Sequence, residues 1–395
     1  GYTLHLMIHP VFPTQRDAKG KLKTIADGET GGKSESFMHV EIDRETDPAR
    51  LKAIEEGLLS VLADVSHAVA DWRAMLDRMS GIIEELDSPP VGLSEAEVAE
   101  GRVFLSWVND GHFTLLGFRE YELLSEKGED QLRIVPESGL GLLRDAPPGG
   151  MSNSFTESPP SIRKLARLPN LLVLTKANVR ATVHRPGYLD YIGIKRFDAK
   201  GKVIGERRFV GLYTSSAYHA RLREIPLLRN KATAVVERAG FAPNSHMGKN
   251  LLTILEAFPR DELFQIDETS LLEMTLGILR LGDRRKIRVF IRREAYGRYY
   301  SCLVYLPREK FNTESRLRIQ EVLKRALHGL SVEFTVELSE ATLARIHFMV
   351  RSSPQEESVV DPRDIEADIV LALRDWADDL RLALNESRGE EIANQ

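Results

Sequence analysis

Hydrophobic and polar residues alternate along some short segments of the chain and repeat every three or four residues along others. The segment "SFMHVEID" at 36–43 alternates and predicts a strand, as does the apolar segment "YTLHLMI" at 2–8. Residues 48–79 carry apolar side chains at helical spacing. Asp47 and Pro48 are typical of a helix N-cap and a first helical position. The predicted apolar helix face comprises Leu51, Ile54, Leu58, Leu62, Val65, Val69, Trp72, Leu76 and Met79.

A second section begins after the Pro-rich segment "DSPPVGLS" at 87–94, which ends that helix. Ser94 and Glu97 have the spacing of a capping box at the start of another helix. Five β-prone segments follow, with a Pro, Gly and Ser-rich loop at 144–161 that we expect to be mobile. Strands with few helices predict an antiparallel sheet. The predicted strands are 113–123, 131–135, 170–176, 188–197 and 203–213.

The pattern becomes helical over residues 225–281, with breaks at 240–245 and 258–267, where Asp267 is a predicted N-cap. A third section then reads strand, strand, helix, strand, strand, which can pack one helix against one sheet. Gly329 is the predicted stop of its helix. The segments of this section are 286–307 for the first two strands, 314–329, 331–338 and 343–352, and a final helix is predicted at 364–384.

Composition favours a soluble protein of two or three domains. The chain has 395 residues, of which 42% are hydrophobic and 29% charged. Its net charge of −5 disfavours nucleic acid and anionic membranes as partners. One cysteine excludes an intrachain disulfide. The first ten residues lack the features of a signal peptide, so we expect a cytoplasmic protein.

Motifs for common catalytic sites are missing from the sequence. The nearest match to a dinucleotide-binding G-x-G-x-x-G is "SGLGLLRD" at 138–145, which has arginine in place of the last glycine. "HMGKNLL" at 246–252 lacks the Ser or Thr of a phosphate-binding loop. His5, His9 and His39 fit half-exposed strand positions better than a metal site. We therefore expect no catalytic residue, metal or cofactor in this chain.

The segment "RPGYLDY" is the best candidate for binding a small effector. Arg185 can hold a carboxylate, and Tyr188 or Tyr191 can cover it. The alternative is a strand that enters a sheet after a turn. His112 and Arg119 in "NDGHFTLLGFREYE" are spaced to line a sheet face, where packing is again the alternative.

The basic segment 283–294 alternates, with Lys286, Arg288 and Arg292 on the side opposite the apolar residues. A charged face that protects a sheet edge is the favoured interpretation in an acidic chain. An ion-pair surface that docks another domain is a second one. A single-stranded nucleic-acid site, with tyrosines 296, 299 and 300 stacking on bases, is a weaker third.

Several segments of the chain, occurring in the same order, resemble the N-terminal half of the large bacterial NAD-specific glutamate dehydrogenases. The resemblance covers nearly the whole chain and implies ACT-type domains and a PAS-like domain. It places the catalytic region, with its NAD-binding fold, later in the family's chain. The segments are "FMHVEIDRE", "GHFTLLGFREYE", "SGLGLLR", "LTKANVRATVHRPGYLDYIGIKRFD", "RRFVGLYTSSAY", "LLEMTLGILRLGDRRKIRVFIRRE" and "YYSCLVYLPREKFNTESRLRIQEVL".

The expected fold class is therefore α+β and multidomain, with ACT-type (ferredoxin-like) modules flanking a PAS-like domain and helical linkers. The sequence opens at what resembles the second strand of an ACT domain, so we expect the first such domain to be partial and its effector loop to be missing. The expected domains are a partial ACT-type domain at 1–88, a PAS-like domain at 92–222, a helical linker at 223–282, an ACT-like domain at 283–353 and a C-terminal helical motif at 360–395.

The resemblance implies a non-catalytic regulatory and oligomerisation segment of an NAD-dependent glutamate dehydrogenase. Its expected partners are its own catalytic domain and other subunits. The alternatives are an amino-acid-sensing module and, more weakly, a single-stranded nucleic-acid binder. The pentapeptide "DAKGK", which occurs at Asp17–Lys21 and Asp198–Lys202, predicts two hairpin turns and no duplicated domain, because its flanks differ.

Overall fold

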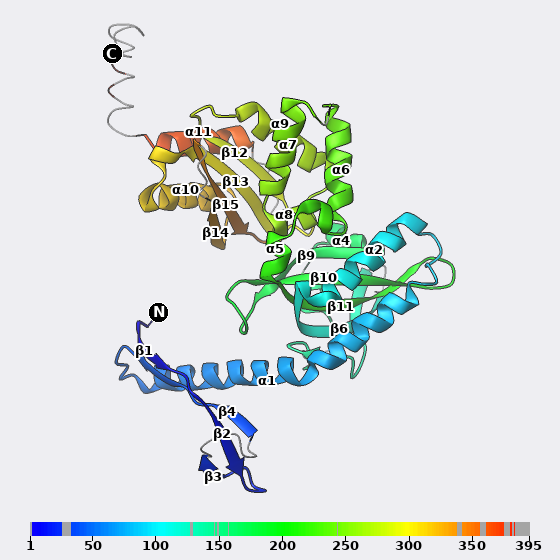
Figure 1. Cartoon of the computed structure of the whole chain (residues 1–395), viewed down its shortest axis with the longest axis vertical. Helices are drawn as coiled ribbons and strands as arrows, with labels where there is room; N and C mark the ends of the chain where they lie inside the picture. The colour runs from blue at the N-terminus through cyan, green and yellow to red at the C-terminus, as the bar shows by residue number, and fades with distance from the viewer. Residues whose placement is uncertain are drawn as a thin grey trace. The chain divides into compact units, whose positions relative to one another are not determined.

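The structure, a computed structural model, describes residues 2–25, 33–126, 129–145, 147, 150–156, 158–242, 244–337, 342–355, 361–374, 380 and 383 (Figure 1). The chain divides into two compact units, Gly1–Ala63 and Asp64–Gln395. Within the described ranges no helix is long and apolar enough to span a membrane.

Short strands in the first unit form two small antiparallel sheets. β1 pairs with β5, and β2 lies between β3 and β4. The predicted strands at 2–8 and 36–43 are confirmed as β1 and β5. The first "DAKGK" turn joins β2 to β3, and the Asp17 carboxylate accepts hydrogen bonds from the backbone N–H groups of Lys19 and Lys21, both 2.9 Å long. The strands are β1 (Leu4–Ile8), β2 (Val11–Arg16), β3 (Leu22–Ile25), β4 (Lys33–Ser36) and β5 (His39–Ile42).

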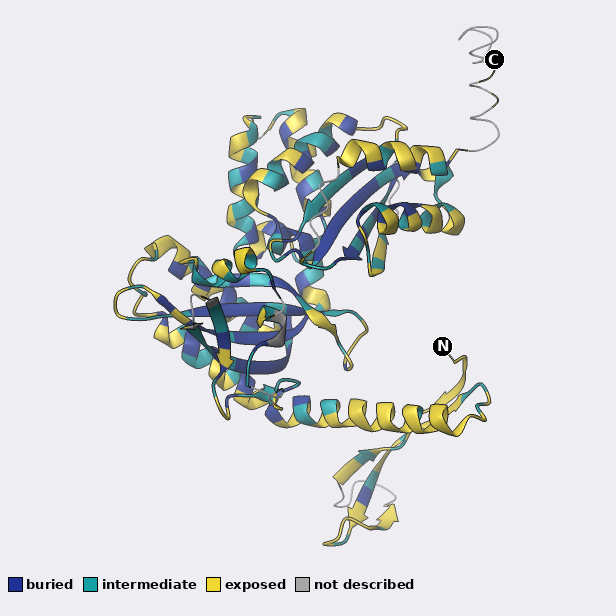
Figure 2. Ribbon diagram, turned by 180° about the vertical axis from the view of Figure 1, so that it is seen from behind, coloured by how far each residue is buried: buried dark blue, intermediate teal, exposed yellow. Residues whose placement is uncertain are grey.

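Helix α1 (Pro48–Glu85) begins where the sequence predicts. The Asp47 carboxylate accepts the N–H of Ala49 at 2.9 Å, which satisfies one free donor of the first turn. The buried residues of this helix begin at Ala68 and continue to Ile82, whereas Leu58 is 60% exposed and Val69 is 66% exposed (Figure 2). The amphipathic pattern therefore predicts the helix correctly, but only the C-terminal part of the helix has buried side chains.

The larger sheet of the second unit is antiparallel, in the order β7-β6-β11-β10-β9, with β8 paired to β6. The five predicted strands are confirmed, and the second "DAKGK" turn joins β10 to β11. The expectation of one mobile loop at 144–161 is corrected, because two short helices form in the described part of it. The strands are β6 (Phe113–Glu126), β7 (Glu129–Ile134), β8 (Leu140–Gly141), β9 (Leu172–Arg180), β10 (Tyr188–Phe197) and β11 (Val203–Tyr213), and those helices are α3 (Asn153–Thr156) and α4 (Pro160–Arg163).

The two faces of this sheet differ in chemistry. Phe118 and Phe209 pair across β6 and β11 and belong to the main apolar core, which also includes Phe104 of α2 (Glu95–Trp107). The next cross-strand pair, Arg119 and Arg208, points to the opposite face, because side chains alternate along a strand. One face is therefore an apolar core and the other carries charge.

Ser94 caps α2 as predicted, since its hydroxyl accepts the N–H of Glu97 at 3.1 Å. The Glu97 carboxylate does not return to Ser94 but accepts the N–H of Leu171 at 2.8 Å. Only half of the expected capping box forms, because Glu97 satisfies the backbone at the entry to β9 instead.

The helical region at 225–281 and its break at 240–245 are confirmed, and the Asp267 carboxylate accepts the N–H of Ser270 at 2.9 Å. The break expected at 258–267 is corrected, because a further helix, α8, occupies most of it. Its helices pack on the main core, where the rings of Tyr213 and Phe264 stack 4.5 Å apart. The helices and short turns between the two sheets are α5 (Ser215–His219), η3 (Leu222–Glu224), α6 (Leu228–Ala239), α7 (His246–Ala257), α8 (Arg260–Gln265) and α9 (Glu268–Leu281); η1 (Val108–His112) and η2 (Lys164–Arg167) lie earlier in the chain.

The last sheet is antiparallel, in the order β12-β13-β15-β14. Its core includes Cys302, fully buried beside Ile319 of α10 and Ile365 of α11, so two helices cover the face for which one was expected. Phe290 of β12 packs instead with the main core, because alternation turns it to the other face. The elements are β12 (Arg288–Arg293), β13 (Tyr299–Pro307), η4 (Arg308–Lys310), α10 (Thr313–Ala326), β14 (Ser331–Glu337), β15 (Leu343–Arg351) and α11 (Pro362–Ala372).

The predicted helix stop at Gly329 is off by one residue. The left-handed backbone lies at His328, with φ of 49°, and the N–H of Gly329 closes the helix on the carbonyl of Lys324 at 2.7 Å. The final predicted helix is described as α11, and most of its residues after 374 lie outside the described residues. The α+β class with antiparallel sheets is confirmed, whereas the PAS-like domain and the domain bounds stay predictions.

Candidate functional site

The predicted effector residues lie in different parts of the second unit. Arg185 lines one cavity, and Arg119 and Tyr191 line a second one. Tyr188 and His112 line neither of these two cavities. The effector-binding role of these five candidate residues stays a prediction, and the two cavities have different chemistry.

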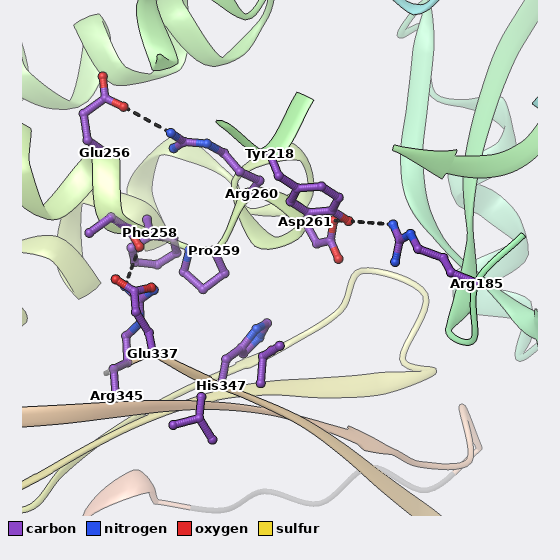
Figure 3. Close-up of a pocket in the computed structure, with 13 residues that line it drawn as sticks. Arg185, Tyr218, Glu256, Phe258, Pro259, Arg260, Asp261, Glu337, Arg345 and His347 are labelled. Atoms are coloured by element: carbon purple, nitrogen blue, oxygen red, sulfur yellow. Dashed lines mark hydrogen bonds and ion pairs between the residues drawn. The ribbon is translucent and has the colours of Figure 1, made fainter. Parts of the chain in front are cut away.

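The first cavity, called the junction cavity below, has a volume of about 480 Å³ and is bordered by three regions of the second unit (Figure 3). The first region comprises the β9–β10 connection with Arg185 and α5 with Tyr218, the second connects α7 to α8, and the third is the β14–β15 edge of the smaller sheet. The lining residues are Arg185, Tyr218, Glu256, Ala257, Phe258, Pro259, Arg260, Asp261, Thr335, Val336, Glu337, Arg345 and His347.

Arg185 is held at this cavity by the turn that enters β10. The backbone of His184 has φ of 74°, a conformation that few non-glycine residues adopt. The Arg185 guanidinium donates to the carbonyl of Tyr213 at 3.1 Å and to the hydroxyl of Tyr218 at 3.4 Å. Within the described part of the chain it has no carboxylate partner, so its charge is available to an anion.

A buried ionic network lies beside the junction cavity. Lys176 contacts Asp190 at 2.6 Å and Asp261 at 2.9 Å, and the Tyr218 hydroxyl donates to Asp261 at 2.7 Å. Burial raises the pKa of Asp190, although Lys176 opposes the rise. Burial also opposes the ionisation of Asp261, but Lys176 and Tyr218 hold its pKa below its ordinary value. The network thus joins β9 and β10 to α8 by one cation shared between two acids.

The remaining charged groups of the junction cavity are paired. Arg260 donates to Glu256 at 3.1 Å, and Arg345 pairs with Glu337 and donates to the carbonyl of Ala257 at 2.5 Å. Two nitrogens of Arg260, Nε and Nη1, are buried with no hydrogen-bond partner among the described residues. Guanidinium and carboxylate groups therefore stand around one space, an arrangement that suits a ligand carrying both charges.

The second cavity, called the sheet cavity below, lies on the charged face of the larger sheet and has a volume of about 330 Å³. Arg119 and Tyr191 line it together with Arg208. The Tyr191 hydroxyl donates to the carboxylate of Glu206, and burial raises the pKa of Tyr191 well above its ordinary value. The phenol is therefore a neutral hydrogen-bond donor at neutral pH.

Tyr188 and His112 have structural contacts. The guanidinium of Arg351 lies 3.6 Å from the ring centre of Tyr188, a cation–π contact between the two sheets of the unit. The ring of His112 stacks on Trp107 with centroids 4.4 Å apart, and its Nδ1 lies 2.9 Å from the carbonyl oxygen of Trp107.

The predicted docking residues differ in exposure. Lys286 precedes β12 and is exposed. Arg288 pairs with Glu366 of α11 at 2.8 Å and keeps 51% of its side chain exposed. Arg292 keeps 10% exposed and forms a two-bond ion pair with Glu262 of α8, in which Nη2 donates at 2.9 Å. Arg292 thus attaches the helical region to the smaller sheet within this chain.

Sequence reasoning missed several residues that line the junction cavity or lie in the ionic network beside it. Asp261 and Lys176 are 85 positions apart in sequence, and Arg345 lies on a strand that alternation alone describes as ordinary. These residues lie close together only because the tertiary fold brings distant segments of the chain into contact. A charged residue in an otherwise apolar strand, such as Lys176 after "NLLVLT", was the one available signal.

Three regions of the chain match known protein families. Residues 1–58 match the family described as glutamate dehydrogenase, ACT1 domain; residues 225–284 match glutamate dehydrogenase, helical motif 1; and residues 288–377 match glutamate dehydrogenase, ACT2 domain. The order of the three regions along the chain agrees with the resemblance seen in the sequence.

Individual relatives agree with these family matches. An NAD-specific glutamate dehydrogenase of Halomonas elongata is 40% identical over 100% of this chain and 25% of its own length. One of Pseudomonas aeruginosa is 38% identical over 99% of this chain and 24% of its own length. One of Mycobacterium tuberculosis is 30% identical over 96% of this chain and 23% of its own length. The chain therefore spans about a quarter of the relatives that it matches.

Proposed function

We propose, from the premise that this chain belongs to the NAD-specific glutamate dehydrogenase family, that it is a non-catalytic regulatory and assembly segment of such an enzyme. The observation that carries the proposal is the ordered match to the ACT1, helical motif 1 and ACT2 regions. The sequence also lacks the dinucleotide motif that hydride transfer to NAD requires of a Rossmann-type domain.

The complete enzyme would convert L-glutamate, NAD and water to 2-oxoglutarate, ammonia and NADH. The groups that bind NAD and glutamate would lie in the part of the protein that this chain does not cover. The role of the present segment would be to contact that catalytic region and other subunits of a homo-oligomer in the cytoplasm.

A PAS-like domain at 92–222 is part of this proposal. Its support is the strand order β7-β6-β11-β10-β9, in which the last strand of the segment lies at the centre of an antiparallel sheet. Such a sheet, with one charged face and short helices beside it, is a reasonable sensory module between ACT-type regions.

An amino-acid effector in the junction cavity is the second element of the proposal. Arg185 offers a guanidinium without a carboxylate partner among the described residues, and the carboxylates of Asp261 and Glu256, which pair with Lys176 and Arg260, line the same cavity. A free amino acid has one group for each. Because three regions of the second unit border the cavity, a bound ligand would favour one arrangement of those regions over another.

The first experiment compares this 395-residue chain with the complete protein that contains it. We expect NADH formation from L-glutamate and NAD by the complete protein and none by the chain alone, measured by absorbance at saturating substrate. An enzyme-like rate from the chain alone would overturn the proposal.

The second experiment screens amino acids against the chain by thermal shift and calorimetry. We expect at least one to raise Tm, and we expect Arg185→Gln to weaken its binding at least tenfold. Arg223→Gln, an exposed arginine outside the cavity, is the matched control. No stabilisation at millimolar concentrations would remove the effector role and leave the assembly role.

A further inference from the structure

Two buried arginines stand directly opposite each other in the larger sheet. Arg119 of β6 and Arg208 of β11 are cross-strand neighbours on the charged face, 4% and 9% exposed. Residues in this relation have Cβ atoms roughly 5 Å apart, and like charges placed so are destabilising. Burial increases the cost, since arginine stays charged and water cannot screen the pair.

Only one of the two guanidinium groups has a counter-charge. Arg208 donates to Glu206 at 3.3 Å and lies over the rings of Tyr121 and Tyr191, at 4.1 and 4.8 Å. Arg119 donates to backbone carbonyls alone, those of Leu143 and Asp145. No carboxylate of the described residues forms an ion pair with it. A buried charge without a counter-charge destabilises the fold.

The sheet cavity adjoins this uncompensated charge. Arg298 and Arg180 line it as well, each with its own carboxylate elsewhere, Glu294 at 2.9 Å and Glu333 at 2.7 Å. Asp64 is the lining carboxylate among the described residues, and it accepts the hydroxyl of Thr182 at 2.7 Å. Four arginines and one carboxylate among the described residues therefore line the cavity, and Arg119 is the one of these arginines without an ion-pair partner.

Several apolar side chains also line the cavity. Leu143, Leu189 and Val210 line it, and Leu189 and Val210 are 3% and 4% exposed. A volume of about 330 Å³ lies at the lower end of the range for small-molecule sites, roughly 300–1,000 Å³. A ligand that fits must carry a negative group toward Arg119 and a compact hydrocarbon body toward these side chains.

We propose that the sheet cavity binds a small organic anion, a carboxylate with an apolar body, whose carboxylate pairs with Arg119. The pairing supplies the counter-charge that Arg119 lacks, and a guanidinium can hold a carboxylate by two parallel bonds. A free amino acid fits less well, because its ammonium group would stand among arginines. The site is distinct from the junction cavity and its existence does not depend on the effector role proposed there.

Calorimetric titration of the 395-residue chain tests the site with 4-methylpentanoate as the probe. We expect saturable binding of this acid and at least tenfold weaker binding of its neutral amide, of leucine and of inorganic phosphate. Arg119→Gln should weaken binding of the acid at least tenfold. Arg133→Gln, on neighbouring β7 with 54% of its side chain exposed, is the matched control and should leave binding unchanged.

A second variant keeps the test decisive if Arg119→Gln fails to fold. Ala177 lines the same cavity, and Ala177→Leu fills space while leaving both arginines in place. It should weaken binding of the acid at least tenfold. Equal binding of acid and amide, equal effects of the Arg119 and Arg133 variants, unchanged binding by Ala177→Leu, or no binding of the acid at all would each overturn the proposal.

Discussion

Single residues in the repeated turn show how local chemistry sets backbone geometry. In both copies of "DAKGK" the aspartate carboxylate accepts two backbone N–H groups, and the glycine has φ near 80°, +79° at Gly20 and +78° at Gly201. The surroundings differ, however. A Cβ at Gly201 would lie 2.3 Å from the carbonyl oxygen of Val91, whereas nothing lies within 4 Å of one at Gly20.

Replacement of Gly201 by alanine should therefore destabilise the second unit. The left-handed conformation costs a non-glycine residue about 1–2 kcal/mol, and the backbone clash adds to it, so we expect a loss of about 2 kcal/mol or more in the free energy of unfolding. Gly240→Ala, at φ of +71° with open space around it, should lose only about 1 kcal/mol. Urea unfolding of both variants measures the difference, and equal losses would contradict the role given to Val91.

At the residue scale, the sequence predicts those features in which a side chain bonds to a group a few positions away. Asp47, Ser94 and Asp267 cap helices as predicted, because a cap bonds to a backbone group two or three positions away. Glu97 was harder, since its partner, Leu171, is 74 residues distant. The candidate site has the same limit. Arg185 stands out by its Pro-Gly neighbours, but Asp261 joins it only through the tertiary fold.

Among the elements, β12 shows how one strand serves two layers. Alternation turns Val289 to the core shared with α10 and α11, and turns Phe290 and Arg292 toward the helical region. The pattern of 283–294 predicts this two-sided strand. It does not tell a solvent face from a buried ion pair, because both place charged side chains on the same side of the strand.

The Arg292–Glu262 pair should be sensitive to losing one partner and tolerant of losing both. Arg292→Met leaves the 2% exposed Glu262 carboxylate unpaired, and we expect a loss of about 3–5 kcal/mol in the free energy of unfolding. Adding Glu262→Leu should restore most of it. Arg288→Met, at a half-exposed pair, should cost no more than about 1 kcal/mol. Chemical denaturation of the variants measures these values. Equal losses for the Arg288 and Arg292 single variants would argue against a buried pair.

Across the second unit as a whole, Lys176, Asp190 and Asp261 connect the larger sheet to the helical region. Two buried acids share one lysine, so the set holds one negative charge in excess when both are ionised. Burial raises the pKa of Asp190 to about 6, against the attraction of Lys176. This links the stability of the assembled modules to pH.

Asp190 should make the unit less stable as the pH rises from about 4 to about 6. A carboxyl with a higher pKa in the folded chain holds its proton more tightly there, so its contribution to stability is present below the unfolded pKa and lost through the folded one. Asp190→Asn removes this contribution. We therefore expect the free energy of unfolding of the variant, minus that of the wild type, to increase over this range. Asp283→Asn, at an exposed position, is the control, and a difference that stays flat or decreases with pH would refute the assignment.

The lone cysteine gives the smaller sheet an internal reporter. Cys302 is fully buried, and burial raises the pKa of its thiol, so a thiol reagent cannot modify it while the sheet is closed. Because the sequence has no other thiol, every labelled molecule records one opening of the layer between β13 and α10. The rate of labelling, followed with and without an effector or an organic acid, then reads the motion of one module without any introduced probe.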